Sequence, residues 1–254
     1  MKKTHIQLIL LPALLCAANL FAQTNAAPLP LDKLHPALLP TLRSTNTNWL
    51  GRHEGFVAQA KQGGVDILFL GDSITDYWRN RGSNVWNKYY APMHAANFGI
   101  GGDRTQHVLW RIENGELDGI KPKVTVLMIG TNNSGDDSAE DIATADKLIV
   151  QEIRARCPGT KVLLLAIFPR GPRKNSNGTL DDGIKHMAVI HAVNEQLAKL
   201  DDGKNIHYLD IGPKFLGPDG KIPNDVMPDH LHPDEHGYQI WADAMNPTLD
   251  EMLK

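Results

Sequence analysis

Residues 66–75, with the sequence DILFLGDSIT, decide the fold. The run ILFL is apolar without alternation, which is typical of a strand covered on both faces of a sheet. The glycine and the small polar residues after it predict a tight turn from a strand into a helix, and such a turn exposes Ser73. The stretch therefore indicates a buried strand that brings a reactive side chain to one edge of its sheet.

The same pattern continues along the chain. Four more short apolar runs predict strands at 95–98 (AANF), 123–129 (KVTVLMI), 161–168 (KVLLLAIF) and 206–209 (IHYL). Segments with helical periodicity lie at 104–117, 139–157, 182–200 and from about 235 to 252. Strands that alternate with helices predict an α/β fold with right-handed crossovers, a three-layer α/β/α sandwich around about five parallel strands.

The N-terminus has the pattern of a secretory signal peptide. Lys2 and Lys3 precede an apolar run at 8–18, which is too short to span a bilayer. Small residues follow, so we expect cleavage near Ala22 and export to the periplasm or the medium. A lipid anchor at Cys16 is disfavoured, because a large residue precedes this cysteine.

The rest of the chain is expected to form one domain. Residues 23–40 hold four prolines without a sustained period and predict an extended arm. Residues 41–254 show no repeat and no change of composition, which favours a single domain. Only Cys157 follows the expected signal peptide, so no internal disulfide is expected, and we expect this thiol to be buried.

The charge excludes some classes of partner. The formal net charge is −3, and lysines and arginines form no long run. A mildly acidic chain of this kind is not expected to bind nucleic acid or an anionic membrane surface.

Small and reactive residues follow the predicted strands. They occur at 71–75 (GDSIT), 99–103 (GIGGD), 130–133 (GTNN) and, in the loop after the last strand, 229–232 (DHLH). Ligand sites of open α/β sheets lie at the carboxyl ends of the strands. We therefore expect these four clusters to converge on one edge.

Together these residues have the chemistry that ester hydrolysis needs. Ser73 can attack a carbonyl, His232 can take its proton, and Asp229 can hold the imidazole in the required tautomer. The backbone N–H groups of Ser73 and Gly102 and the side-chain amide of Asn132 are the expected oxyanion donors. Asp72 is expected to make structural hydrogen bonds.

The order of these blocks resembles the SGNH (GDSL-like) hydrolase superfamily. The matching residues are Gly71-Asp72-Ser73, Gly102, Asn132 and the pair Asp229 and His232. Four longer stretches are similar to the catalytic subunits of type Ib platelet-activating-factor acetylhydrolase: 97–117 (NFGIGGDRTQHVLWRIENGEL), 121–133 (KPKVTVLMIGTNN), 168–172 (FPRGP) and 236–242 (HGYQIWA). The resemblance covers residues 49 to 253 and implies a flavodoxin-like fold with a Ser-His-Asp triad.

The resemblance implies a serine esterase for short acyl groups that needs no cofactor. The first block reads GDSIT instead of GDSL, and the similar acetylhydrolase subunits are intracellular, whereas this chain carries an export pattern. We therefore expect O-acetyl groups on small or polymeric carbohydrates as substrates, with a platelet-activating-factor-like acetylhydrolase or a lysophospholipase as the alternative. A non-catalytic carbohydrate-binding protein is the alternative of another class. The resemblance also allows a homodimer.

Other patterns have a simpler explanation. The stretch 99–104 (GIGGDR) is similar to a dinucleotide fingerprint, but Arg104 stands where the third glycine belongs. The histidines His230, His232 and His236 and the acids near them could form a metal site, but the Asp-x-x-His pair accounts for two of these residues, and we expect no metal. Trp78, Trp86 and Trp110 are expected in the core, and of the three Trp78, five residues after Ser73, is the best candidate for a platform that stacks on a sugar. Arg170 and Arg173 follow the fourth strand as substrate contacts or as solvated loop residues.

Overall fold

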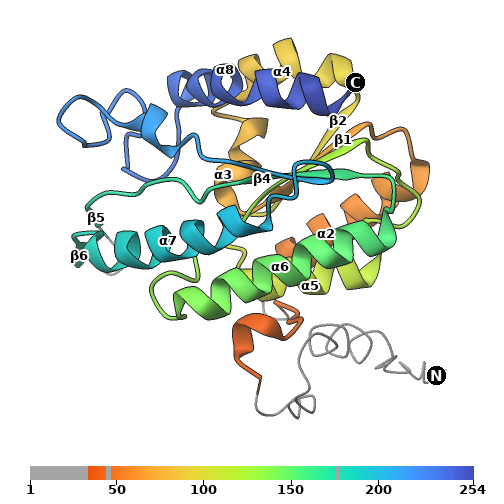
Figure 1. The fold of residues 1–254 in the computed structure, drawn as a ribbon, viewed down its shortest axis with the longest axis horizontal. Helices are drawn as coiled ribbons and strands as arrows, with labels where there is room; N and C mark the ends of the chain where they lie inside the picture. Colours follow the sequence, from red (N-terminus) through yellow and green to blue (C-terminus); the bar gives the residue numbers. More distant parts are fainter. Residues whose placement is uncertain (1–33, 44–46, 175–177) are drawn as a thin grey trace.

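A computed structural model of the chain describes residues 34–43, 47–174 and 178–254. At its centre lies a sheet of five strands in the order β2-β1-β3-β4-β7 (Figure 1). These strands are β1 (Ile67–Gly71), β2 (Ala95–Gly99), β3 (Val124–Met128), β4 (Lys161–Leu165) and β7 (Ile206–Leu209). All four pairings between them are parallel. The predicted sheet is confirmed.

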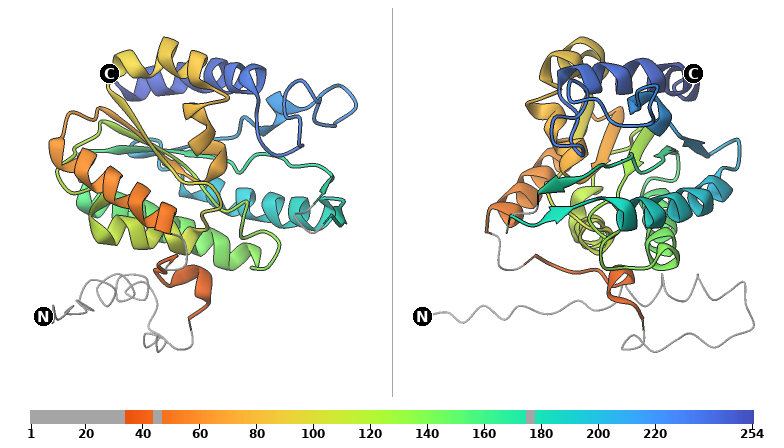
Figure 2. Two further views of the ribbon diagram at one scale, coloured as in Figure 1. Left: turned by 180° about the vertical axis from the view of Figure 1, so that it is seen from behind. Right: turned by 90° about the vertical axis from the view of Figure 1, so that its left-hand side faces the viewer.

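Helices cover both faces of this sheet (Figures 1 and 2). One face carries α2 (Thr47–Gln62), α5 (Thr105–Arg111), α6 (Ala139–Arg156) and α7 (Ile184–Leu197). The other carries α3 (Ser73–Asp76), α4 (Ser83–Tyr89) and α8 (Glu235–Met252). A separate apolar core fills the space on each side of the sheet. This is the predicted three-layer α/β/α sandwich.

Some elements differ from the predicted ranges. The segment 104–117 forms α5 and then a π-helical turn, Ile112–Glu116, instead of one helix. Helix α2 was not predicted, because the buried polar residue His53 interrupts its apolar stripe between Trp49 and Phe56. Strand β4 ends at Leu165, although the apolar run continues to residue 168 and stays buried.

Short elements complete the described chain. They are the 3-10 turns η2 (Pro36–Leu38), η3 (Tyr77–Arg79), η4 (Ala91–Met93), η6 (Ala198–Leu200) and η7 (Gly212–Phe215), and the antiparallel pair β5 (Arg173–Lys174) and β6 (Leu180–Asp181).

The predicted signal peptide, residues 1–22, and the first part of the predicted arm lie outside the described residues. The described part of the arm is not simply extended, because it contains the turn η2. Ala37 in this turn is buried, and its carbonyl accepts a hydrogen bond from Thr105 Oγ1 at 3.0 Å. Within the described ranges, no helix combines the length and apolar character of a membrane span.

Two predictions about single side chains are confirmed. Trp78 is fully buried, with its ring 4.4 Å from Tyr238 and 5.1 Å from Trp241 between centroids. Cys157 is a buried free thiol.

A buried network of charges supports the carboxyl edge of β1 and β2. Arg111 is fully buried, and its guanidinium forms ion pairs with Asp103 (Nε to Oδ2, 2.9 Å) and Glu116 (Nη1 to Oε2, 2.5 Å). The first pair is close in distance but does not have hydrogen-bond geometry. Arg111 also donates to the carbonyls of Phe98 at 2.9 Å and Gly71 at 3.4 Å.

Replacing Arg111 with methionine should destabilise the protein strongly. Glu116 would lose its arginine, and of its two arginines Asp103 would keep only the partly exposed Arg43. Removing one partner of a buried ion pair costs about 3–5 kcal/mol of unfolding free energy. Urea unfolding followed by tryptophan fluorescence measures this loss. The control is Arg156→Met. The Arg156 side chain is 25% exposed and pairs with Glu152 at 2.9 Å. Its loss should cost about 1 kcal/mol or less. Equal losses in the two variants would contradict the role of the network.

Candidate active site

The turn after β1 presents Ser73 at the edge of the sheet. Asp72 caps α3 by accepting the N–H of Ile74 at 2.9 Å, and Ser73 is the first residue of this helix. A Cβ atom on Gly71 would lie 2.4 Å from the carbonyl oxygen of Met128, so only glycine fits here. Close packing of β1 against β3 therefore fixes where the hydroxyl emerges.

Ser73, His232 and Asp229 form a continuous hydrogen-bonded chain. Ser73 Oγ lies 2.9 Å from His232 Nε2, and His232 Nδ1 lies 2.6 Å from Asp229 Oδ2. Asp229 Oδ1 also accepts the backbone N–H of His232 at 2.8 Å. Because the carboxylate accepts the proton on Nδ1, Nε2 is left as an acceptor for the Ser73 hydroxyl.

Asp229 is held in its ionised form. Burial on its own raises the pKa of this carboxyl, but the hydrogen bonds from the side chain and backbone of His232 and the nearby charge of Arg173 lower the pKa well below its usual value. The carboxylate therefore stays charged throughout the neutral range and can stabilise an imidazolium on His232.

The loop that carries this pair is fastened to the segment after β4. His230 adopts a left-handed backbone conformation (φ 54°), and its carbonyl accepts the N–H of Gly171 at 2.8 Å. Its ring contacts the carbonyl of Pro172 and the side chain of Asn224, both at 2.9 Å. His230 is thus a polar loop residue.

Gly102 lies in the loop between β2 and α5. Its φ of +77° favours glycine, and a Cβ atom here would also lie 3.4 Å from Arg43 Nη2. Within the described residues, its backbone N–H donates no hydrogen bond. The neighbouring Gly101 comes close to the nucleophile, because a Cβ atom on it would lie 3.8 Å from Ser73 Cβ.

Asn132 follows β3 at the same edge. Its Nδ2 donates to the carbonyl of Asp103 at 2.8 Å and lies 3.5 Å from Asp72 Oδ2. The amide therefore sits between the Ser73 turn and the Gly102 loop. To serve an oxyanion, it has to direct one N–H away from these partners, so its role as a donor stays a prediction.

Comparison with known proteins places this chain in a family. The model of the GDSL-like lipase/acylhydrolase family matches residues 69–240. The chain belongs to this family. It is therefore a carboxylic ester hydrolase, and the resemblance found in the sequence is confirmed.

Individual relatives agree with this assignment. The acylhydrolase is 38% identical over 223 residues to human platelet-activating factor acetylhydrolase IB subunit alpha2. The aligned region covers 87% of this chain and 93% of the relative. A GDSL-like lipase from Bacteroides thetaiotaomicron has the same fold, with a TM-score of 0.62 at 15% identity over 80% of this chain and 98% of the other. An acetyl xylan esterase gives a TM-score of 0.54 at 19% identity over 72% and 98%.

Asp76, which was not predicted as a site residue, connects the helix of Ser73 to the Gly102 loop. Asp76, one helical turn after Ser73, accepts the N–H of Gly101 through Oδ2 at 3.1 Å. Arg52 binds both of its oxygens at 2.6 Å, and Arg79 binds Oδ1 at 2.5 Å. Burial raises the pKa of Asp76, but the two guanidinium groups outweigh it and keep the pKa low. The spacing of three residues after Ser73 was the one local signal.

Asp72 makes the structural hydrogen bonds that were predicted for it, and its carboxyl group has a raised pKa. Its side chain is 1% exposed, and burial raises its pKa to about 7. The acylhydrolase thus carries a carboxyl group next to Ser73 that is partly neutral near physiological pH.

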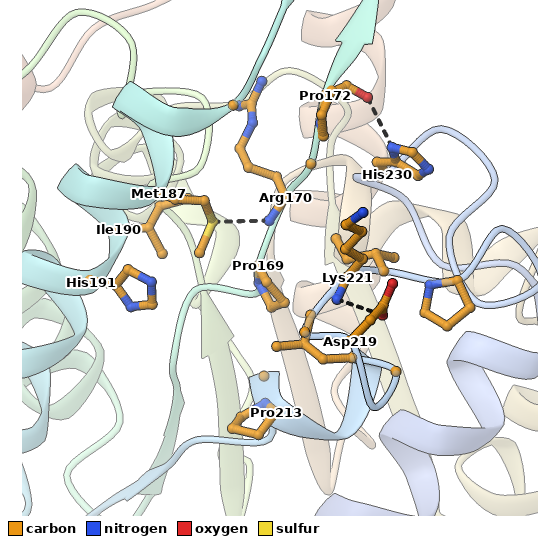
Figure 3. Close-up of a pocket in the computed structure, with 18 of the residues that line it drawn as sticks. Pro169, Arg170, Pro172, Met187, Ile190, His191, Pro213, Asp219, Lys221 and His230 are labelled. Atoms are coloured by element: carbon orange, nitrogen blue, oxygen red, sulfur yellow. Dashed lines mark hydrogen bonds between the residues drawn. The ribbon is translucent and has the colours of Figure 1, made fainter.

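A cavity of about 970 Å³ adjoins the site (Figure 3). Met187 and Ile190 of α7 line one wall, and the segment around Lys221 lines the other. His230 closes it on the side of the Asp229–His232 loop. Its lining combines aliphatic side chains and prolines with several polar and charged side chains. It does not include Ser73, so the cavity lies beside the hydrogen-bonded chain and does not contain it.

The histidines and acids near the Asp229–His232 loop were considered as a possible metal site. Across the described ranges, no group of three or more His, Cys, Asp or Glu side chains is arranged to hold a metal ion. His236 contacts Asp225 through Nδ1, at 3.2 Å from its carbonyl oxygen and 3.5 Å from its carboxylate.

Replacing Asp76 with asparagine should slow hydrolysis. The change removes the charge that holds Arg52 and Arg79 and weakens the anchor of Gly101, so the loop should shift relative to Ser73. We expect kcat to fall by about 10- to 100-fold with little change in KM, since small displacements in a preorganised site have effects of this size. Steady-state kinetics with an aryl acetate measures both constants.

The matched control for this prediction is Asp66→Asn. Asp66 precedes β1 at the opposite edge of the sheet and pairs with Lys123 and His94 while 39% exposed. Its replacement should leave kcat unchanged. If Asp76→Asn also retained the wild-type kcat, the proposed link between the two loops would be unnecessary for turnover.

The raised pKa of Asp72 predicts a pH dependence of stability. The folded pKa is about 7, whereas an unfolded aspartate titrates near pH ~3.9. The folded state therefore holds this proton more tightly, and its contribution is complete below pH ~4 and is lost as the pH rises through ~7. In Asp72→Asn no such proton exists, and the amide oxygen can still cap Ile74.

Urea unfolding of both proteins at several pH values tests this. Between pH 4 and pH 7 the unfolding free energy of the wild type should fall relative to that of the Asp72→Asn variant by roughly 3–5 kcal/mol. Parallel pH profiles would show that Asp72 is ionised in the folded protein.

Proposed function

We propose that this acylhydrolase removes short acyl groups, chiefly acetyl, from carbohydrate esters through the triad Ser73, His232 and Asp229. The observation that carries the proposal is the hydrogen-bonded chain from Ser73 Oγ to His232 Nε2 (2.9 Å) and from His232 Nδ1 to Asp229 (2.6 Å). The acetyl preference is supported by the curated relative, whose name is that of an acetylhydrolase.

In the proposed mechanism, His232 Nε2 accepts the proton of the Ser73 hydroxyl while Oγ attacks the ester carbonyl. The tetrahedral intermediate collapses when the same nitrogen gives this proton to the leaving alcohol. A water molecule, deprotonated by His232, then attacks the acyl-enzyme, and the acid leaves as Ser73 recovers its proton. Asp229 keeps the imidazole oriented and stabilises its charged form at each step.

The negative charge on the intermediate needs donors that are in place before it forms. We assign this role to the backbone N–H groups of Ser73 and Gly102 and to the amide of Asn132. The unused N–H of Gly102, together with the approach of Gly101 to Ser73, supports the assignment.

The carbohydrate part of the proposal depends on where the enzyme works. The basic start and apolar run at the N-terminus favour export with cleavage near Ala22. Outside the cytoplasm, acetylated polysaccharides and their fragments are accessible esters.

The cavity favours a second candidate. Its mixed lining, in which aliphatic side chains and prolines lie beside charged groups near the triad loop, suits an amphiphilic ester. The alternative function is therefore that of a phospholipid acetylhydrolase, as in the name of the relative, or of a lysophospholipase. Faster release of acetate from an alkyl-chain alcohol than from an acetylated sugar would favour it.

Hydrolysis of 4-nitrophenyl acetate, butyrate and octanoate tests the proposed activity. We expect the rate to fall with acyl length, to be independent of EDTA, and to be nearly abolished in Ser73→Ala. Asn132→Ala should reduce kcat by about 10²–10³, as for other oxyanion donors. The control Asn114→Ala changes an exposed asparagine on the surface and should have no effect.

Two results would contradict the proposal. Activity that survives the loss of Ser73 would show that another nucleophile or a metal is responsible. Binding of acetylated sugars without hydrolysis of any ester would point to the non-catalytic carbohydrate-binding protein.

A further inference from the structure

Two arginines from distant segments are anchored on the base of the proposed triad. Arg81 Nη1 lies 3.4 Å from the backbone carbonyl of His232, and Arg173 Nη2 lies 3.8 Å from Asp229 Oδ2. Arg81 follows η3, and Arg173 begins β5. The two guanidinium groups therefore approach the His232–Asp229 pair from separate elements.

Arg81 is held in place by stacking. Its guanidinium carbon lies 5.0 Å from the centre of the Tyr77 ring, and the Tyr77 ring lies 4.9 Å from the His232 ring. Arg81 is an exposed residue and forms no ion pair with any described acid. A guanidinium has five N–H donors, so this one keeps most of them for a ligand.

The positive charge of Arg173 is only partly compensated by a carboxylate. Its nearest carboxylate, Asp229, is already bonded to the ring and the backbone of His232. The Arg173 side chain is 26% exposed. Arg43, near Gly102, differs because the buried carboxylate of Asp103 pairs with it at 3.3 Å. Among the described residues, Arg170 also lies near Asp229 but pairs with Asp181 at 3.3 Å. Arg81 and Arg173 are thus described cations beside the His232–Asp229 pair whose charge is incompletely compensated.

The position of these cations identifies the part of the substrate that they contact. In the proposed mechanism, His232 gives its proton to the oxygen of the leaving alcohol, so the alcohol lies against His232. Arg81 contacts the backbone carbonyl of His232 and Arg173 contacts Asp229, so both cations belong to the rim of the residue pair that serves the leaving alcohol. The chain has a net charge of −3, so this positive charge is a local feature.

We propose that the alcohol part of the ester carries an anionic group, a carboxylate or a phosphate, that binds to the guanidinium groups of Arg81 and Arg173 at this rim. This inference rests on the proposed function and deepens it, since it restricts the substrates to acidic sugars or phosphorylated alcohols. Arginine suits both groups, because its planar fork matches their oxygens with paired hydrogen bonds.

Matched pairs of acetate esters test this proposal. The carboxylate pair is O-acetylated methyl glucuronoside and its uncharged glucuronamide, and the phosphate pair is acetylglycerol phosphate and acetylglycerol. In each pair the ratio of kcat/KM, from acetate release, isolates the effect of the charge. We expect the wild type to prefer one or both anionic members by about tenfold in 20 mM NaCl, and the ratio to shrink in 500 mM NaCl as salt screens the exposed charges. The pair with the larger ratio identifies the anion.

Variants connect the ratio to the two arginines. In Arg81→Gln and Arg173→Gln the ratio should fall several-fold, and in the double variant it should approach one. Arg81→Lys and Arg173→Lys keep the charge and should retain much of the preference, which a role in packing alone does not predict. The control Lys199→Gln removes an exposed positive charge on η6 and should leave the ratio unchanged.

A wild-type ratio near one in both pairs, or a ratio that the glutamine variants leave unchanged, would overturn the proposal. If neutral aryl acetate were still hydrolysed in a Ser73-dependent manner, the proposed function would stand without it. If no ester were hydrolysed, the proposed function itself would fail and this inference with it.

Discussion

The guanidinium of Arg111 is the contact on which the carboxyl edge of the sheet depends. It binds the carbonyls of Gly71 at the end of β1 and Phe98 in β2, while Asp103 and Glu116 balance its charge. Gly71 leads directly into the turn of Ser73, and Asp103 follows Gly102. One buried cation therefore sets the spacing of the two segments that ester hydrolysis has to bring together, and it is tolerated in the core only because both carboxylates accompany it.

Above this buried layer, shorter contacts fix the reacting groups themselves. Asp76 joins α3 to the loop of Gly101, and Asp229 orients both the ring and the backbone of His232. Ser73 begins a short helix and the other site residues lie on loops, and hydrogen bonds of about 3 Å hold Ser73, Asn132, Asp229 and His232. Donors placed in advance are what a transition state with developing charge requires, because they need no reorganisation during the reaction.

The strands and the His–Asp pair could be predicted because they leave local signatures. Unbroken apolar runs indicate buried strands, and Asp229 is close enough in sequence for one turn to bring it to His232. Contacts between distant segments leave none: Arg52 and Asp76 are 24 residues apart, and Arg81 and His232 are 151 apart. Helix α2 was missed because His53 is buried in contact with Glu116, 63 residues away, and no local pattern reveals this contact.

The brevity of α3 has a consequence for folding kinetics. The helix has four residues, whereas an isolated helix shorter than roughly 12–15 residues is marginal in water. Its serine meets a histidine 159 positions further along the chain. The Ser73 hydroxyl is therefore positioned only by completed tertiary structure. Under the proposed mechanism, an intermediate that has its long helices but not the loop of His232 is inactive. During refolding, recovery of esterase activity follows the last step of assembly and not the formation of secondary structure.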